Sequence, residues 1–172
     1  ENNVMVDLTQ DEETLFAQCR PTYRRYIRRA REHDLTLCRE KPMERVEDFS
    51  TLYGATMARH GQTGNLNFPK DFFHILFGNL GPDILMFSVR RRDRMAAAAV
   101  FMVFENTLDY FLGASDASLL KYYPNHFMFF EILNWARGKG FELMHLGGGR
   151  KSLLHFKRGF SKASAPFYIG HA

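Results

Sequence analysis

The fold is decided by the stretch DILMFSVRRRDRMAAAAVFMVFENTLDYFLGAS (residues 83–115). It holds three strand-like apolar runs, at 83–90, 94–104 and 107–115, which only the short polar segments RRD and EN separate. Turns this short join neighbouring antiparallel strands. The stretch therefore predicts a three-stranded antiparallel meander.

Helical and strand-like patterns continue outward from this meander. Strands are expected at 3–8, 34–40, 141–147 and 165–170, and helices at 9–31, 45–61, 68–81 and 125–140. Thr9 and Glu12 form a capping-box pattern for the first helix, and Pro21 should kink or restart it. A loop is expected between the strand at 141–147 and the last strand. This order predicts an α/β fold, with a mixed, mostly antiparallel sheet flanked by helices.

Length and composition predict a single domain over residues 1–172. Hydrophobic residues make up 45% of the chain and charged residues 24%, as in soluble globular proteins. The two cysteines are too few for a disulfide framework, which favours a reducing compartment and a cytoplasmic location. No apolar run reaches the ~20 residues of a transmembrane helix. Because the chain begins with Glu1 and not with methionine, we expect a fragment or a trimmed chain that a further domain could precede, and its oligomeric state stays open.

Positive charge is concentrated in RPTYRRYIRRAR (20–31), which holds six arginines and no acid. Arginine side chains at this density suit the recognition of phosphate groups. The phosphates could belong to an anionic small molecule, to a lipid-linked molecule or to tRNA. A solvated helix face is the alternative, but the absence of acids favours binding by four residues: Arg24, Arg25, Arg28 and Arg29.

A second unusual segment is HLGGGRKSLLHFKRGF (145–160). Gly147, Gly148 and Gly149 permit positive backbone φ angles and the close approach of a ligand, or form a flexible exit from the strand. Lys157 stands between Phe156 and Phe160, where partial desolvation would strengthen the electrostatic effect of its charge. The alternative is a surface lysine whose stem covers apolar surface.

Three segments carry a family resemblance: YRRYIRRARE (23–32), residues 112–149 and LLHFKRGFS (153–161). With the element order between them, they resemble the GNAT acyltransferase fold and, more narrowly, the FemAB-type aminoacyltransferases. The resemblance implies transfer of an acyl or aminoacyl group to an amine of a cell-wall or surface-polysaccharide precursor. It places Lys157 at the reaction centre beside Phe156, and it implies one half of a tandem pair, most like the second.

The sequence differs from that of GNAT enzymes at one place that affects which acyl donor is expected. GNAT enzymes that use acetyl-CoA hold its pyrophosphate with a glycine-rich loop before a helix. Here no glycine lies between Ser115 and Phe127. This difference counts against ordinary acetyl-CoA binding. It agrees with the FemAB-type enzymes, for which the resemblance implies aminoacyl-tRNA as donor and no tightly bound cofactor. A CoA-dependent N-acetyltransferase with an altered loop stays as an alternative.

The remaining candidates lie where the resemblance implies that the sheet opens for the acyl group. Tyr110 either hydrogen-bonds to the substrate or belongs to the core, and Ser115 lies at the end of the same expected strand. Asp116 either accepts a proton from the attacking amine or ends the strand. Asn125 and His126 begin the buried helix. For His126 a structural role is favoured. No metal-ligand spacing appears. A non-catalytic module that binds nucleic acid or another anion is the rival function.

Overall fold

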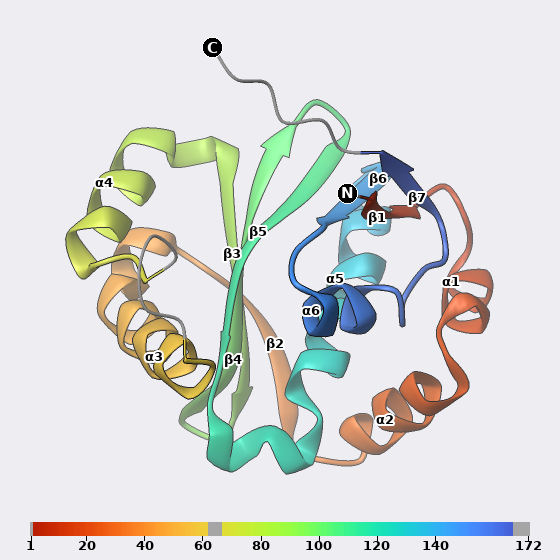
Figure 1. The fold of residues 1–172 in the computed structure, drawn as a ribbon, viewed down its shortest axis with the longest axis horizontal. Coiled ribbons are helices and arrows are strands. Elements are labelled where there is room, and N and C mark those ends of the chain that lie inside the picture. Colours follow the sequence, from red (N-terminus) through yellow and green to blue (C-terminus); the bar gives the residue numbers. More distant parts are fainter. Residues whose placement is uncertain (1, 62–66, 167–172) are drawn as a thin grey trace.

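The computed structural model describes residues 2–61 and 67–166 (Figure 1). Within these ranges the strands form one sheet in the order β2-β3-β4-β5-β6-β1-β7. All neighbouring strands are antiparallel except β5 and β6. The strands are β1 (Asn2–Asp7), β2 (Leu35–Glu40), β3 (Ile84–Arg91), β4 (Arg94–Phe104), β5 (Thr107–Ser115), β6 (Leu143–Gly147) and β7 (Ser164–Pro166). The predicted meander and mixed sheet are confirmed.

Helices cover both faces of this sheet. They are α1 (Glu12–Gln18), α2 (Pro21–Arg31), α3 (Val46–Arg59), α4 (Lys70–Leu80), α5 (Pro124–Gly138) and α6 (Lys151–Lys157), with 3₁₀ turns η1 (Pro42–Arg45), η2 (Gly81–Asp83) and η3 (Ala117–Tyr122). Figure 1 shows α3 and α4 on one side, and α1, α2, α5 and α6 on the other. Across 2–61 and 67–166, none is long and apolar enough to span a membrane.

Burial on both faces explains why the meander is so uniformly apolar. Along β3, Leu85, Phe87 and Val89 pack into the core under α2 and α5. The intervening Ile84 and Met86 pack into the core under α3 and α4. Side chains alternate between the two faces of a strand, so a strand covered on both sides is apolar at most positions. Ser88, the buried polar residue of β3, donates its hydroxyl to Glu40.

Three local expectations were wrong or incomplete. The first helix begins later than the capping-box pattern indicated, because Asp11 is its N-cap and accepts from the Thr14 amide (2.7 Å). Thr9 instead donates its amide and hydroxyl to Asp7. The loop expected after β6 contains helix α6. Of the last expected strand, β7 covers its first part, and residues 167–170 lie outside the described ranges.

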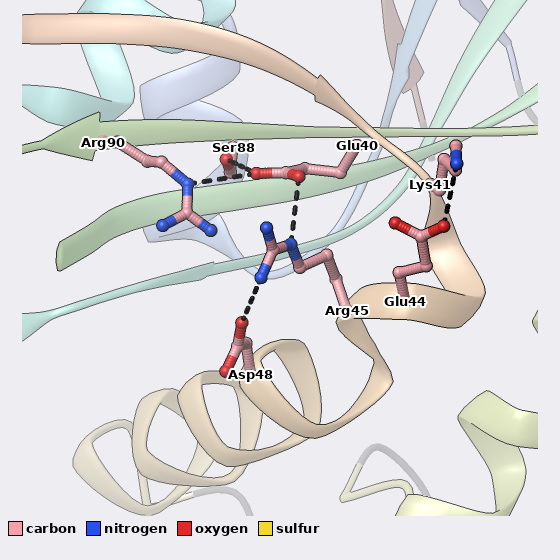
Figure 2. Close-up of polar contacts among 7 residues, drawn as sticks. All are labelled: Glu40, Lys41, Glu44, Arg45, Asp48, Ser88 and Arg90. Carbon is pink, nitrogen blue, oxygen red and sulfur yellow. Dashed lines mark hydrogen bonds and ion pairs between the residues drawn. The ribbon is translucent and has the colours of Figure 1, made fainter. Parts of the chain in front are cut away.

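A partly buried carboxylate, that of Glu40, ties α3 to the edge of the sheet (Figure 2). Glu40 accepts from the Ser88 hydroxyl (2.5 Å) and from Nε of Arg90 (3.2 Å) and of Arg45 (3.2 Å). Arg45 also pairs with Asp48 in the first turn of α3. Burial alone raises the pKa of Glu40, but these hydrogen bonds outweigh it and hold the pKa below its ordinary value. The Glu40 carboxylate thus holds the start of α3 against the edge of the sheet.

The sheet opens between β5 and β6. Their parallel pairing covers only Thr107 to Asp109 against Leu143 to His145, while β5 continues to Ser115. A bulge in β5 at Phe111 accompanies this opening, because Leu112 and Tyr110 pair with adjacent residues of β4. Bulges turn side chains toward a different face and recur beside active sites.

Candidate active site

A cleft lies at this opening, bounded by α3, β5, α5 and α6. It consists of two adjoining cavities of about 240 and 380 Å³. Both are lined by Thr56, His60, Tyr110, Gly113, Arg150 and Leu153. One wall of the cleft therefore comes from the meander and the other from the segment after β6, which the sequence separates by more than thirty residues.

Lys157 is the buried cation of this cleft. The residue is 4% exposed and lines the larger cavity. Its Nζ donates to the Gly148 carbonyl (2.7 Å) and lies 5.1 Å from the centre of the Tyr110 ring. Burial lowers its pKa to about 8, although the charge of Asp109 partly opposes this shift. Near neutral pH the side chain is thus mostly protonated and poorly solvated.

Tyr110 lies against the backbone of its own strand. The β5 bulge brings its side chain over Gly113, where a Cβ atom would come 2.3 Å from the phenol oxygen. Burial raises the pKa of Tyr110, so the phenol stays protonated and able to donate a hydrogen bond. Glycine at 113 is required for this close approach.

Several predicted residues line or border the same cleft. Asn125 and Phe156 line the smaller cavity, and Gly149 the larger one. Gly147 and Gly149 have φ angles of 72° and 119°, which glycine adopts without strain. Ser115 also lines the smaller cavity, and its carbonyl accepts from Arg59 (2.8 Å) and from Thr56 (3.2 Å).

Two of the predicted site residues, Asp116 and His126, do not line the cleft. Asp116 forms an ion pair with Arg94 (2.5 Å) and caps η3 through Ser118. Burial raises its pKa, but the Ser118 and Arg94 contacts outweigh this and lower it. It lines a neighbouring cavity of about 660 Å³ rather than the cleft.

His126 packs among aromatic rings, with Tyr23 at 4.5 Å and Phe156 at 5.3 Å between ring centroids. Burial lowers its pKa to about 4, so the imidazole is neutral. This environment is that of a core histidine.

The α2 arginines do not line the cleft. Arg24 donates from Nη1 to the carbonyls of Ala17 and Cys19 (2.8 Å each). Arg25, Arg28 and Arg29 are exposed. In the described part of the chain, none of these four arginines forms an ion pair.

Sequence reasoning missed the residues that α3 contributes. Thr56 lies at the face of α3 toward β5, and His60 follows the last turn. Burial and the charges of Arg150 and Arg59 lower the pKa of His60. Their place in the cleft depends on where α3 packs, and no local motif marks that packing.

The connection from β5 to α5 enters the helix through Tyr123 and Pro124. Tyr123 takes a left-handed conformation (φ 57°) before Pro124, which has no backbone N–H to donate. The Tyr123 ring stacks on Tyr26 of α2 at 4.4 Å between centroids. Aromatic side chains thus occupy the start of α5.

The mixed sheet, with its short parallel pair β5–β6 that opens beyond Asp109, is that of the GNAT acyltransferase fold. Residues 17–158 match the family described as acetyltransferase (GNAT) domain, and the chain belongs to this family. No curated protein matches.

Solved structures share the fold. FemX has a TM-score of 0.82 at 15% identity, and covers 92% of this chain and 58% of its own. The C-terminal domain of a putative lysylphosphatidylglycerol synthetase from Agrobacterium fabrum has a TM-score of 0.68 at 19% identity, with 96% and 57% coverage. L-PGS from Bacillus licheniformis has a TM-score of 0.63 at 13% identity, with 95% and 57% coverage. The chain thus spans somewhat over half the length of each.

Proposed function

We propose that this domain transfers an aminoacyl or other acyl group from an activated ester to an amine. The observation that carries the proposal is the buried Lys157 cation against Tyr110, at the opening between β5 and β6. A fixed cation in a poorly solvated cleft stabilises negative charge that develops during carbonyl attack. No side chain of the described residues needs to form a covalent intermediate for this reaction.

The reaction follows from the polar groups around the cleft. The amine nitrogen attacks the acyl carbon, and a C–N bond forms while the bond to the leaving oxygen or sulfur breaks. Lys157 stabilises the negative charge on the carbonyl or leaving oxygen. The nitrogen loses a proton, and the leaving group gains one. Holding both reactants side by side supplies much of the acceleration.

The β5–α5 connection supports aminoacyl-tRNA as the donor. Acetyl-CoA binding of the usual kind needs backbone amides near the start of the helix. Pro124 and the stacked Tyr123 occupy that place here. The name lysylphosphatidylglycerol synthetase describes an aminoacyl group joined to a lipid by a protein of this fold. For the acceptor, we propose an amine of a cell-wall or surface-polysaccharide precursor, which is anionic or lipid-linked.

Isothermal titration calorimetry and a transfer assay test the donor. We expect no saturable heat with acetyl-CoA, and transfer of a labelled amino acid from charged tRNA to an amine acceptor. Saturable acetyl-CoA binding, with acetyl transfer to the same amine, would replace this proposal with a CoA-dependent N-acetyltransferase. Nucleic-acid binding without either transfer would favour a non-catalytic module. Circular dichroism verifies that the protein is folded in each case.

His60 is the proton acceptor in this proposal. It lines both cavities, whereas Asp116 is held by Arg94 outside the cleft. Its lowered pKa keeps the imidazole neutral and able to accept a proton near pH 7. We expect H60Q to lower kcat about 100-fold at pH 7 and to remove the acidic limb of the pH–rate profile.

The matched control is H74Q, because His74 is a histidine of α4 outside the cleft. Its rate should equal that of the wild type. An H60Q enzyme that keeps the wild-type acidic limb would remove His60 from the mechanism.

A further inference from the structure

A strongly basic pocket lies on the far side of α6 from the cleft. Its volume is about 350 Å³, and it forms where α1 and α2 meet the end of α6. Four cations line it without any acid: Arg20, Arg24, Arg158 and Lys162. The other lining residues are Ala17, Gln18, Cys19 and Pro21. We call this cavity the basic pocket.

Two of its guanidinium groups are held in place by the protein. Nη1 of Arg24 donates to two backbone carbonyls at the end of α1, those of Ala17 and Cys19. Nη1 of Arg20 donates to Nε2 of His155 (2.7 Å). Each guanidinium carries five N–H donors, so both retain donors for another partner. Their orientation is thus set before any ligand arrives.

The charge of the basic pocket is not balanced within the protein. None of its four cations forms an ion pair with a carboxylate of residues 2–61 or 67–166. Like charges gathered in one concavity repel one another, and a multivalent anion relieves this repulsion. Guanidinium forks match phosphate oxygens in pairs. We propose that the basic pocket binds adjacent phosphate groups, as in a pyrophosphate or two consecutive phosphodiesters.

Helix α6 links the basic pocket to the cleft. The Arg20 amide donates to the Gly159 carbonyl (2.8 Å), and Arg158 follows Lys157 directly. Lys157 and Phe156 face the cleft, while His155 and Arg158 face the basic pocket side. A ligand whose phosphates occupy the basic pocket is therefore held against the helix that carries the buried lysine. This inference deepens the proposed function, since it concerns the anionic part of a donor or acceptor.

Calorimetric titration with inorganic pyrophosphate tests the basic pocket. The wild type should bind saturably, and more weakly as salt is raised. The R158Q/K162Q double variant should bind at least about tenfold more weakly, because it loses two of four phosphate-binding cations. Both residues are exposed, so the fold should survive their replacement.

The matched control removes one arginine and one lysine from exposed positions outside the basic pocket, in R92Q/K139Q. It should bind pyrophosphate as the wild type does. Absence of wild-type binding, or equal weakening in both double variants, would overturn the proposal. Because no turnover is measured, failure of the transfer assay would leave this result unaffected.

A second titration identifies the source of the phosphates. A single-stranded RNA tetranucleotide that binds more tightly than pyrophosphate, and loses affinity in R158Q/K162Q, supports a nucleic-acid backbone in the basic pocket. Binding of pyrophosphate without the RNA supports a diphosphate-containing small molecule. RNA affinity that R158Q/K162Q leaves unchanged would place any RNA contact elsewhere and contradict a phosphodiester ligand here.

Discussion

K157M is expected to lower kcat by about 100- to 1000-fold while leaving KM nearly unchanged, because it removes a charge that acts mainly in the transition state. Met has a similar length and suits the buried site next to Tyr110 and Phe156. The measurement is steady-state kinetics with the donor that the transfer assay identifies. K139M serves as the control, since Lys139 is exposed at the end of α5.

The same variant gives a stability readout that needs no substrate. Below a pH of about 8, Lys157 is protonated in both the folded and unfolded chains. Between about 8 and 10.5 only the unfolded chain keeps the proton, so the folded state gains stability as pH rises. The gain is about 3 kcal/mol in total at about 1.4 kcal/mol per pKa unit.

Comparing K157M with the wild type isolates this contribution, because the other titrating groups are common to both. In urea titrations at about pH 7.5, 9 and 10.5, the free energy of unfolding of the wild type should rise relative to that of K157M as the pH rises. A constant difference across this range would mean that Lys157 is not a buried cation. Wild-type kcat with K157M would reject its role in the reaction.

G159A should destabilise the fold by about 2–3 kcal/mol, the cost of overpacking a dense core. A Cβ at Gly159 would lie 2.0 Å from Cε2 of Tyr23. That ring cannot withdraw easily, because Tyr23 is 8% exposed and packs against Phe156 and Phe160. Thermal unfolding should show a Tm lower by roughly 5–10 °C for a chain of this length.

The control for G159A is G54A. Gly54 lies inside α3, and beyond its chain neighbours and its own helix backbone no atom lies within 4 Å of its added Cβ, so alanine should stabilise the fold by about 0.5–1 kcal/mol. In a Y23L background, G159A should cost less than in the wild type. An equal cost in both backgrounds would show that Tyr23 is not the source of the clash.

Most of the fold could be predicted from periodicity. The meander could be predicted because short polar turns separate its apolar strands. Helix α5 could be predicted because its apolar run begins at Pro124. Helix α6 was missed, since three glycines precede it and its seven residues give too short a pattern. The start of α1 was misplaced because the Asp7 carboxylate, rather than a helix, takes the Thr9 hydroxyl and amide.

Only part of the candidate site could be predicted from the sequence, because some of its residues are placed by packing between distant segments. The position of Lys157 came from a motif, and the structure brings it to Tyr110. By contrast, His60 lies in the cleft only because of how α3 packs. Asp116 forms an ion pair with Arg94, which belongs to strand β4. Contacts between distant segments leave little trace in a local pattern. The bulge at Phe111, which sets the direction of Tyr110, has a faint signal in the strand glycine Gly113.

The place of β1 inside the sheet has a consequence for the order of folding. Val4 pairs with Gly147, whereas Val89 pairs with Ala97 in the meander. Closing the longer loop costs about 2.5 kcal/mol more chain entropy. Contacts between distant segments also slow folding. The meander is therefore expected to form early and the β6–β1–β7 side last, so the folding chain can hold a hydrophobic core before the cleft between β5 and α6 exists.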